Sequence, residues 1–312
     1  MARLELRRLR NFLAVVEAGS ISAAAVRLDI PQPALSRELR LLEESLGCQL
    51  LTRHRRGVVA TASGEALLRQ AADLLRRADS LEQSVRAAAG RVEGQLALGI
   101  IPTLAHGLAG RILENFQAQY PNVRIRVEES LSGHLIDMLE RGSIDLAITY
   151  LAGRLRGMDS RLLLEESLHL VGAVGSSLAG GRGVSLKVAL SQPMALPGPD
   201  HALRRLVETA ARQSGSTLNN VIEVNSLALQ MELATRGVAH TVLPLATVAA
   251  QLARGELFAR PLANPAISRR LAIVVPRSRP LSAACVAMRK TWLETAPALI
   301  RSGNWPGASS LP

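Results

Sequence analysis

Apolar residues recur at helical spacing in three short runs near the start of the chain. The first run predicts an amphipathic helix that begins near Leu6 and ends at Gly19, since glycine commonly closes a helix. A second, short helix follows, with Ser20 or Ser22 as its N-cap residue. The third run predicts a helix that opens at residues 32–33 and buries Leu35, Leu39, Leu42 and Leu46.

The third helix is polar on the face opposite its leucines. Glutamine can pair bidentately with adenine and arginine with guanine, so this face has the side chains of a recognition helix in the major groove. A helical unit with one polar face could also be a protein-interaction module, and this stretch alone leaves both readings open. The residues predicted to contact DNA here are Gln32, Pro33, Ser36, Arg37 and Arg40.

Two short segments, 49–52 and 58–61, predict strands that flank a basic turn ending at Gly57. A basic hairpin beside a recognition helix is typical of a wing that contacts phosphates or the minor groove. The hairpin therefore favours DNA over a protein partner. We expect Arg53, Arg55 and Arg56 to serve this wing, with Arg53 either contacting phosphate or bracing the hairpin internally.

A continuous helix is predicted over residues 62–89, with Thr61 as its cap. Small and apolar residues recur in it in alternating steps of three and four, which is a heptad seam. The seam could pack on the rest of the same chain, but dimerisation is favoured because it presents the DNA module twice. The residues of the expected dimer seam are Leu67, Ala71, Leu74, Ala78, Leu81 and Val85.

Strand and helix patterns alternate in the remainder of the chain. A predicted hinge at 90–94 precedes a β-α-β-α-β order, which implies a parallel sheet with helices on its faces. A glycine-rich turn follows at 175–183. The predicted segments are strands at 95–101, 123–128, 144–150 and 168–174, helices at 102–119, 131–141 and 201–214, and an apolar segment at 271–275.

Parallel sheets bind ligands at the carboxyl ends of their strands, where helix N-termini present N–H groups. Thr103 and Ser132 stand at two such points, and further candidates lie at 225–226 and 237–244. Thr103 and Ser132 could equally be plain helix caps. A site of this kind would hold a small polar or anionic ligand without a buried lysine.

Charge and cysteine content restrict the possible functions but do not identify one by themselves. The 312 residues carry a formal net charge of +11, which suits a polyanionic partner, although arginine supplies nearly all of the excess. Cys48 and Cys285 lie far apart without metal-ligand spacing, so we expect two buried neutral thiols. Charges within residues 1–10 and the lack of a long apolar run predict a cytoplasmic protein with no membrane span.

The motifs of the common enzyme classes do not occur. The sequence has no Walker loop, no GxGxxG after a strand, no nucleophile elbow and no HExxH. We therefore expect no catalytic residues, no metal and no cofactor. A solute receptor would suit the second half, but it would not carry a helix-turn-helix.

The motifs at 20–25, 32–39, 42–43, 46–47, 50–53 and 61–64 occur together in an order that closely resembles the LysR-type transcriptional regulators. Pro31, Leu51 and Ala60 depart from the usual serine or threonine, phenylalanine and leucine, and none of the three is a base-reading group. The run 129–135 is most similar to the nitrogen assimilation control subgroup. The resemblance implies a double-stranded DNA operator, a small-molecule effector, and a homodimer or a homotetramer of two dimers.

The second half resembles the family's effector domain over residues 93–300, carried by the motifs at 116–121, 142–147, 223–226 and 243–244. The implied fold is α/β: a winged helix-turn-helix at 1–61, a linker helix at 62–89, and a two-lobed periplasmic-binding-protein-like (type 2) effector domain at 90–312. Lobe I would span about 93–163 and 268–300, and lobe II about 164–267. The implied effector-facing residues are Thr103, Ser132, Tyr150, Pro197, Gly198, Ser226 and Thr241.

Overall fold

The computed structural model describes residues 4–54, 57–88, 91–151, 155–218 and 220–310. By its internal contacts the chain divides into two compact units, Met1–Val85 and Arg86–Pro312. Each unit has its own apolar core and is described by itself.

The N-terminal unit begins with three helices, α1 (Leu6–Ala18), α2 (Ile21–Leu28) and α3 (Gln32–Leu46). Gly19 ends α1 in the left-handed conformation, and the side chain of Ser20, rather than that of Ser22, caps α2 by accepting from the backbone N–H of Ala23. The helix predictions are therefore confirmed. One buried position is wrong: Leu46, the last residue of α3, is 42% exposed.

The predicted wing is an antiparallel hairpin of β1 (Leu51–His54) and β2 (Gly57–Ala60). Glu43 on α3 anchors it, since one carboxylate oxygen accepts from the backbone N–H groups of Leu50 and Leu51 at 2.8 and 3.2 Å. Gly57 has a φ of 134°, and an added Cβ would lie 2.2 Å from the carbonyl oxygen of Gly19. The wing can therefore pack this closely on the turn after α1 only because residue 57 is glycine.

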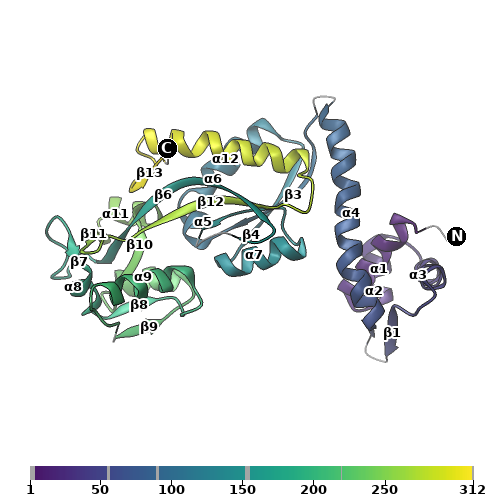
Figure 1. Ribbon diagram of the computed structural model, residues 1–312, viewed down its shortest axis with the longest axis horizontal. Helices are drawn as coiled ribbons and strands as arrows, with labels where there is room; N and C mark the ends of the chain where they lie inside the picture. The colour runs from purple at the N-terminus through teal and green to yellow at the C-terminus, as the bar shows by residue number, and fades with distance from the viewer. Residues whose placement is uncertain (1–3, 55–56, 89–90, 152–154, 219, 311–312) are drawn as a thin grey trace. The chain divides into compact units, whose positions relative to one another are not determined.

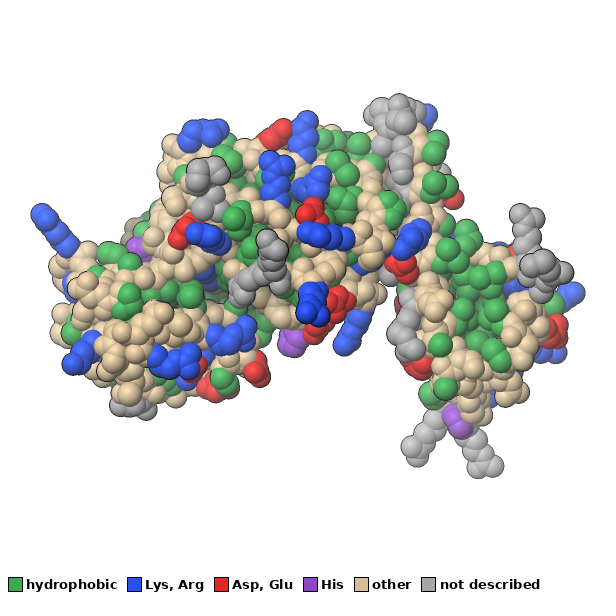
Figure 2. Space-filling model, in the orientation of Figure 1, with side chains coloured by type: hydrophobic (Ala, Val, Ile, Leu, Met, Phe, Trp, Pro, Cys, Tyr) green, Lys and Arg blue, Asp and Glu red, His purple; other side chains and the backbone are tan. Residues whose placement is uncertain are grey.

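Helix α4 (Ala62–Ala88) follows the wing, and Thr61 caps it by accepting from the backbone N–H of Gly64 at 3.1 Å. The predicted seam divides into two parts. Ala71 is buried and Leu67 half-buried in the core of the same unit, as the intrachain alternative supposed. The distal positions differ: Leu74, Leu81 and Val85 are 41%, 69% and 68% exposed, Ala78 is half-buried, and apolar side chains lie at the surface along α4 (Figure 2).

The C-terminal unit starts with the predicted parallel arrangement. Strand β3 (Gly94–Ile100) pairs with β4 (Val123–Glu129) and β5 (Leu146–Tyr150), and the connections carry α5 (Pro102–Gly107), α6 (Ala109–Gln119) and α7 (Ser132–Arg141). The single helix predicted over 102–119 is wrong, because the chain breaks at Leu108 into two helices. Beside the break, Gly107 packs so closely on another segment that an added Cβ would lie 2.8 Å from the carbonyl oxygen of Ala246.

One long strand connects the two halves of this unit. Strand β6 (Met158–Ala173) pairs first with β12 (Ser268–Pro276) and then with β10 (Thr241–Pro244) and β11 (Leu257–Ala263), all antiparallel. The strand predicted at 168–174 is its second half. The first half was not predicted because Asp159, Arg161, Glu165 and Glu166 interrupt the apolar run.

The remaining elements are β7 (Val184–Ser185), α8 (Leu186–Leu190), β8 (Met194–Leu196), α9 (Ala202–Gln213), β9 (Val221–Glu223), α10 (Leu227–Thr235), α11 (Leu245–Ala253), α12 (Ala283–Arg301) and β13 (Ala308–Ser309). In Figure 1, α12 lies beside α6 above the curved sheet and α7 lies below it. Two main cores result, and they divide along β6: Leu164 belongs to the core under α12, together with Trp305, and Leu168 to the core around α8 and α9. We call these parts lobe I and lobe II.

The two cysteines behave differently. Burial raises the pKa of the Cys285 thiol to about 12, which makes it an inert core side chain. Cys48 is exposed, so the expectation that it is buried is wrong. No helix among the described residues is long and apolar enough to cross a bilayer.

Candidate functional site

The exposed face of α3 is the first candidate site. Its leucines are held in the core, which turns Gln32, Pro33, Arg37 and Arg40 outward, while Ser36 is half-buried. Within the described part of the chain, neither Arg37 nor Arg40 has an ion-pair or hydrogen-bond partner. Two unpaired guanidinium groups on one exposed helix face can bind phosphate oxygens or guanine edges.

Ion pairs fix the orientation of this helix. Arg7 and Arg8 on α1 both donate to the Glu38 carboxylate at 3.1 Å. Glu38 is thereby occupied inside the module, which removes its negative charge from competition with DNA at the exposed face. At the wing, Arg53 is exposed and no bracing bond to it is found among the described residues, whereas Arg55 and Arg56 lie outside them.

The second candidate site is a narrow cavity of about 20 Å³ between the two lobes. That is space for about one water molecule. Lobe I contributes α5, β5 and β12 to its wall, and lobe II contributes the N-terminal ends of α9 and α10. The lining residues are Ile101, Pro102, Thr103, Leu131, Tyr150, Pro197, His201, Leu203, Asn225, Leu227, Gln230, Leu243 and Arg269.

Arg269 is the only permanently charged side chain in that lining, and it is 6% exposed. Its Nε and Nη2 atoms donate to Glu166 at 3.1 and 3.0 Å, and Nη2 also donates to the Thr103 hydroxyl at 3.0 Å. The guanidinium carbon lies 3.6 Å from the ring centre of Tyr150, a cation–π contact. On the far side, the Trp305 indole donates to the other Glu166 oxygen at 2.9 Å.

Nη1 of Arg269, in the lining, is buried without a partner among the described residues, and so is the hydroxyl of Ser132, which follows the lining residue Leu131 in the chain. A buried donor without an acceptor costs free energy, so such atoms in a native protein usually have a functional explanation. An oxygen-bearing anion placed in a widened cavity would satisfy the arginine donor. The arrangement is therefore suited to binding a carboxylate or a similar group.

The ionisation of the cluster is set mainly by burial. Desolvation raises the pKa of Glu166 to about 7, opposed by the hydrogen bond from Trp305. Burial also lowers the pKa of Arg269, but a guanidinium stays protonated in proteins. Burial and the charge of Arg205 lower the pKa of His201 to about 4, so this cavity histidine is neutral near pH 7.

The seven predicted effector residues occupy different positions. Thr103, Tyr150 and Pro197 line the cavity. Neither Thr103 nor Ser132 makes a side-chain cap bond, so the plain-cap alternative is wrong for both. The other three are not in the lining: the Gly198 N–H donates to Asn225, exposed Ser226 caps α10, and buried Thr241 donates to Gln230.

The sequence reasoning missed Arg269, Glu166 and Trp305. A signal for the first two is present, because two adjacent arginines and two adjacent glutamates interrupt apolar strands. Strand pairing sets Arg269 opposite Glu166 and Arg270 opposite Glu165. Nothing local in the sequence distinguishes Trp305 as their partner.

Comparisons with known proteins match both parts of the chain to one family. Residues 6–65 match the model of the bacterial regulatory helix-turn-helix proteins of the lysR family, and residues 89–297 match the LysR substrate binding domain. The chain is 29% identical to the HTH-type transcriptional regulator BbuR of Bordetella bronchiseptica, over 96% of this chain and 92% of that protein. It is 28% identical to the nitrogen assimilation regulatory protein nac of Klebsiella aerogenes, over 93% and 94%.

Those two identities are nearly equal, so the expected nitrogen assimilation subgroup stays a prediction. Among solved structures, a variant of full-length OxyR from Pseudomonas aeruginosa has a TM-score of 0.76, with 20% identity and complete coverage of both chains. That likeness concerns the fold.

We expect a titration of the cluster near pH 7. As the pH falls through about 7, Glu166 gains a proton and the emission of the adjacent Trp305 indole changes. Fluorescence of the full chain against pH measures this. The transition should vanish in Glu166→Gln and Trp305→Phe and persist in Trp292→Phe; persistence in Glu166→Gln would assign it to another group.

Proposed function

Since the chain belongs to the LysR family of bacterial transcription regulators, we propose that it binds a double-stranded DNA operator through α3 and the wing and responds to a small anionic effector between its lobes. It works in the cytoplasm as a regulator and not as an enzyme. The domains act as a DNA-binding module at 1–61, a linker helix at 62–89 and an effector domain at 90–312. The proposal that the chain binds DNA rests on Arg37 and Arg40, which lie on the exposed face of α3 and have no partner among the described residues.

The residues that contact DNA bases lie in the first turns of α3. Gln32, Ser36 and Arg37 are the groups that reach base edges, and Arg40 contacts the backbone further along the helix. The wing arginines Arg53, Arg55 and Arg56 contact phosphates and therefore carry affinity without sequence information. Pro33 presets the first turn of α3 and positions these groups.

Dimerisation uses the distal part of α4. Leu74, Leu81 and Val85 are apolar and exposed, they fall at heptad spacing, and within the described chain no other segment covers them. A second α4 would bury them and bring two α3 helices to one operator. The unit formed is a homodimer, or a homotetramer of two such dimers. Ala78 completes the seam, whereas Leu67 and Ala71 support it from within the module.

The effector binds where Arg269 meets Thr103 and Tyr150. A carboxylate or similar anion takes the free Nη1 donor of Arg269, and Ser132 supplies a further donor. The cavity is too small for such a ligand in the described state, so binding must separate the lobes. Because Gly198 and Thr241 are bonded to the lining residues Asn225 and Gln230, and Ser226 caps α10, that movement changes the contacts of lobe II, and this is how occupancy reaches the rest of the protein.

The DNA assignment predicts that substitutions of Arg37 and Arg55 affect DNA binding in different ways. Arg37→Ala should cost about 1 to 3 kcal/mol of binding free energy on the true operator and much less on scrambled DNA, since it removes a base contact. Arg55→Ala should weaken both duplexes alike and reduce the salt slope by about one unit. Binding isotherms on both duplexes across a salt series measure this; equal losses for Arg37→Ala would remove it from the base-reading set.

The dimer assignment predicts that Leu74→Glu with Leu81→Glu yields monomers, because dimerisation would bury two carboxylates without partners. Each side chain is already substantially exposed in the single chain, so the fold should survive. Sedimentation velocity reports the oligomeric state and circular dichroism the helix content. The matched control is Ser63→Glu with Gln70→Glu, which adds the same charge at other exposed positions of α4. A double variant that sediments like the wild type would contradict the assignment.

A further inference from the structure

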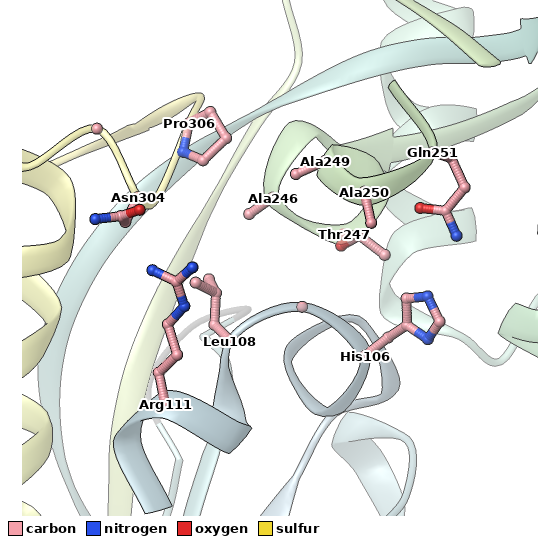
Figure 3. Close-up of a pocket in the computed structure, with 12 residues that line it drawn as sticks. His106, Leu108, Arg111, Ala246, Thr247, Ala249, Ala250, Gln251, Asn304 and Pro306 are labelled. Carbon is pink, nitrogen blue, oxygen red and sulfur yellow. The ribbon is translucent and has the colours of Figure 1, made fainter. Parts of the chain in front are cut away.

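A second cavity, of about 350 Å³, opens at the C-terminal end of α5, whereas the cleft lining uses the start of that helix (Figure 3). Its walls are the end of α5 and the start of α6, the outer face of α11, and the segment that follows α12. No residue lines both cavities. Its volume falls within the range of small-molecule sites, roughly 300 to 1,000 Å³.

The lining of this cavity carries positive charge and no negative charge. Arg111 on α6 points its guanidinium group into the space beside Asn304 (Figure 3). Arg111 has no ion-pair or hydrogen-bond partner among the described residues, and no aspartate or glutamate is part of the lining. An unpaired guanidinium in a concave wall without carboxylates favours an anion, and most strongly a planar carboxylate that it can bind with two parallel bonds.

The rest of the cavity has a different character. The exposed methyl groups of Ala249 and Ala250 form an apolar strip on α11, and beyond the strip lie His106 and Gln251 (Figure 3). The side-chain oxygen of Gln251 is buried and has no hydrogen-bond partner among the residues that the structure describes. It therefore lacks a donor that a ligand could supply.

We propose that this cavity is a second binding site, for a small organic acid. The carboxylate binds Arg111 and Asn304, a short flat apolar body lies on the alanine strip, and a hydroxyl or similar donor at the far end binds Gln251. The site is separate from the cleft between the lobes, and its existence does not depend on what the cleft binds.

The walls of the second site are bonded to the cleft cluster. Thr247, which lines the second site, donates to the backbone oxygen of Thr103 at 3.2 Å. Trp305 stands between the lining residues Asn304 and Pro306 and donates to Glu166. An acid bound at the second site would contact α5, which carries Thr103, and the segment that carries Trp305, the partner of Glu166. We therefore expect the two sites to be coupled, and each ligand then alters the affinity for the other by the same factor.

The test uses the full chain and 4-hydroxybenzoate as the probe, observed through the broadening of its own proton resonances. Arg111→Ala should weaken binding at least about tenfold, because it removes a charge-assisted pair. Ala250→Phe should abolish binding by filling the strip. The controls Arg212→Ala and Ala118→Phe change exposed helix positions elsewhere and should bind like the wild type. The uncharged 4-hydroxybenzyl alcohol should bind much more weakly than the acid.

The cleft variant Thr103→Val separates this proposal from the effector proposal. Probe binding that survives Thr103→Val and fails in Arg111→Ala supports the second site. Probe binding that fails only in Thr103→Val would place the acid in the cleft and overturn the second site while leaving the effector proposal intact. The absence of wild-type binding, or equal affinities for wild type and Arg111→Ala, would also overturn the second site.

Discussion

The ion pair between Arg269 and Glu166 is the constraint on which the effector domain depends. Both side chains are almost fully buried, and taking two charges out of water costs several kcal/mol per ion unless each is well paired. The structure meets that cost with Thr103, Tyr150 and Trp305, which come from three separate elements. The pair therefore ties the start of α5, the middle of the sheet and the C-terminal segment to one point, which lies in the wall of the cleft. A ligand that binds Arg269 must change contacts at all three.

In the N-terminal unit, buried contacts hold α3 in place and leave its outer face free for the proposed contact with DNA. Leu35, Leu39 and Leu42 fix α3 in the core, and Glu38 and Glu43 are occupied by partners within the module. Arg37 and Arg40 on the outer face have no ion-pair or hydrogen-bond partner in the part of the chain that the structure describes. Helix α4 divides in the same way. Its first turns complete the core of the module, and its distal turns expose leucine and valine, so one helix stabilises the fold and carries the expected dimer seam.

Much of this organisation could be predicted from the sequence because it depends on local patterns. Helix periodicity, the Ser20 and Thr61 caps and the heptad steps of α4 are all encoded within a few residues. The break at Leu108 was missed because it goes with close packing of Gly107 on α11, far away in sequence. The Arg269 cluster was missed for the same reason: its members become neighbours only through strand pairing and the return of the chain after α12. Leu67 and Ala71 fit the heptad pattern, yet they are covered by their own module, which periodicity alone cannot reveal.

The central claim is that Arg269 and Glu166 act as one unit that organises the lobes, and a double-mutant cycle tests it most directly. Both tryptophans, Trp292 and Trp305, lie in the C-terminal unit, so denaturant unfolding followed by fluorescence reports on that unit. Above pH 7, where Glu166 is ionised, Arg269→Met alone should cost about 3 to 5 kcal/mol, because it leaves a buried carboxylate unpaired. With Glu166→Gln also present, the loss should be smaller than the sum of the single losses by about 1 to 3 kcal/mol. Losses that add within about 0.5 kcal/mol would show that the two side chains do not depend on one another, which would contradict the account.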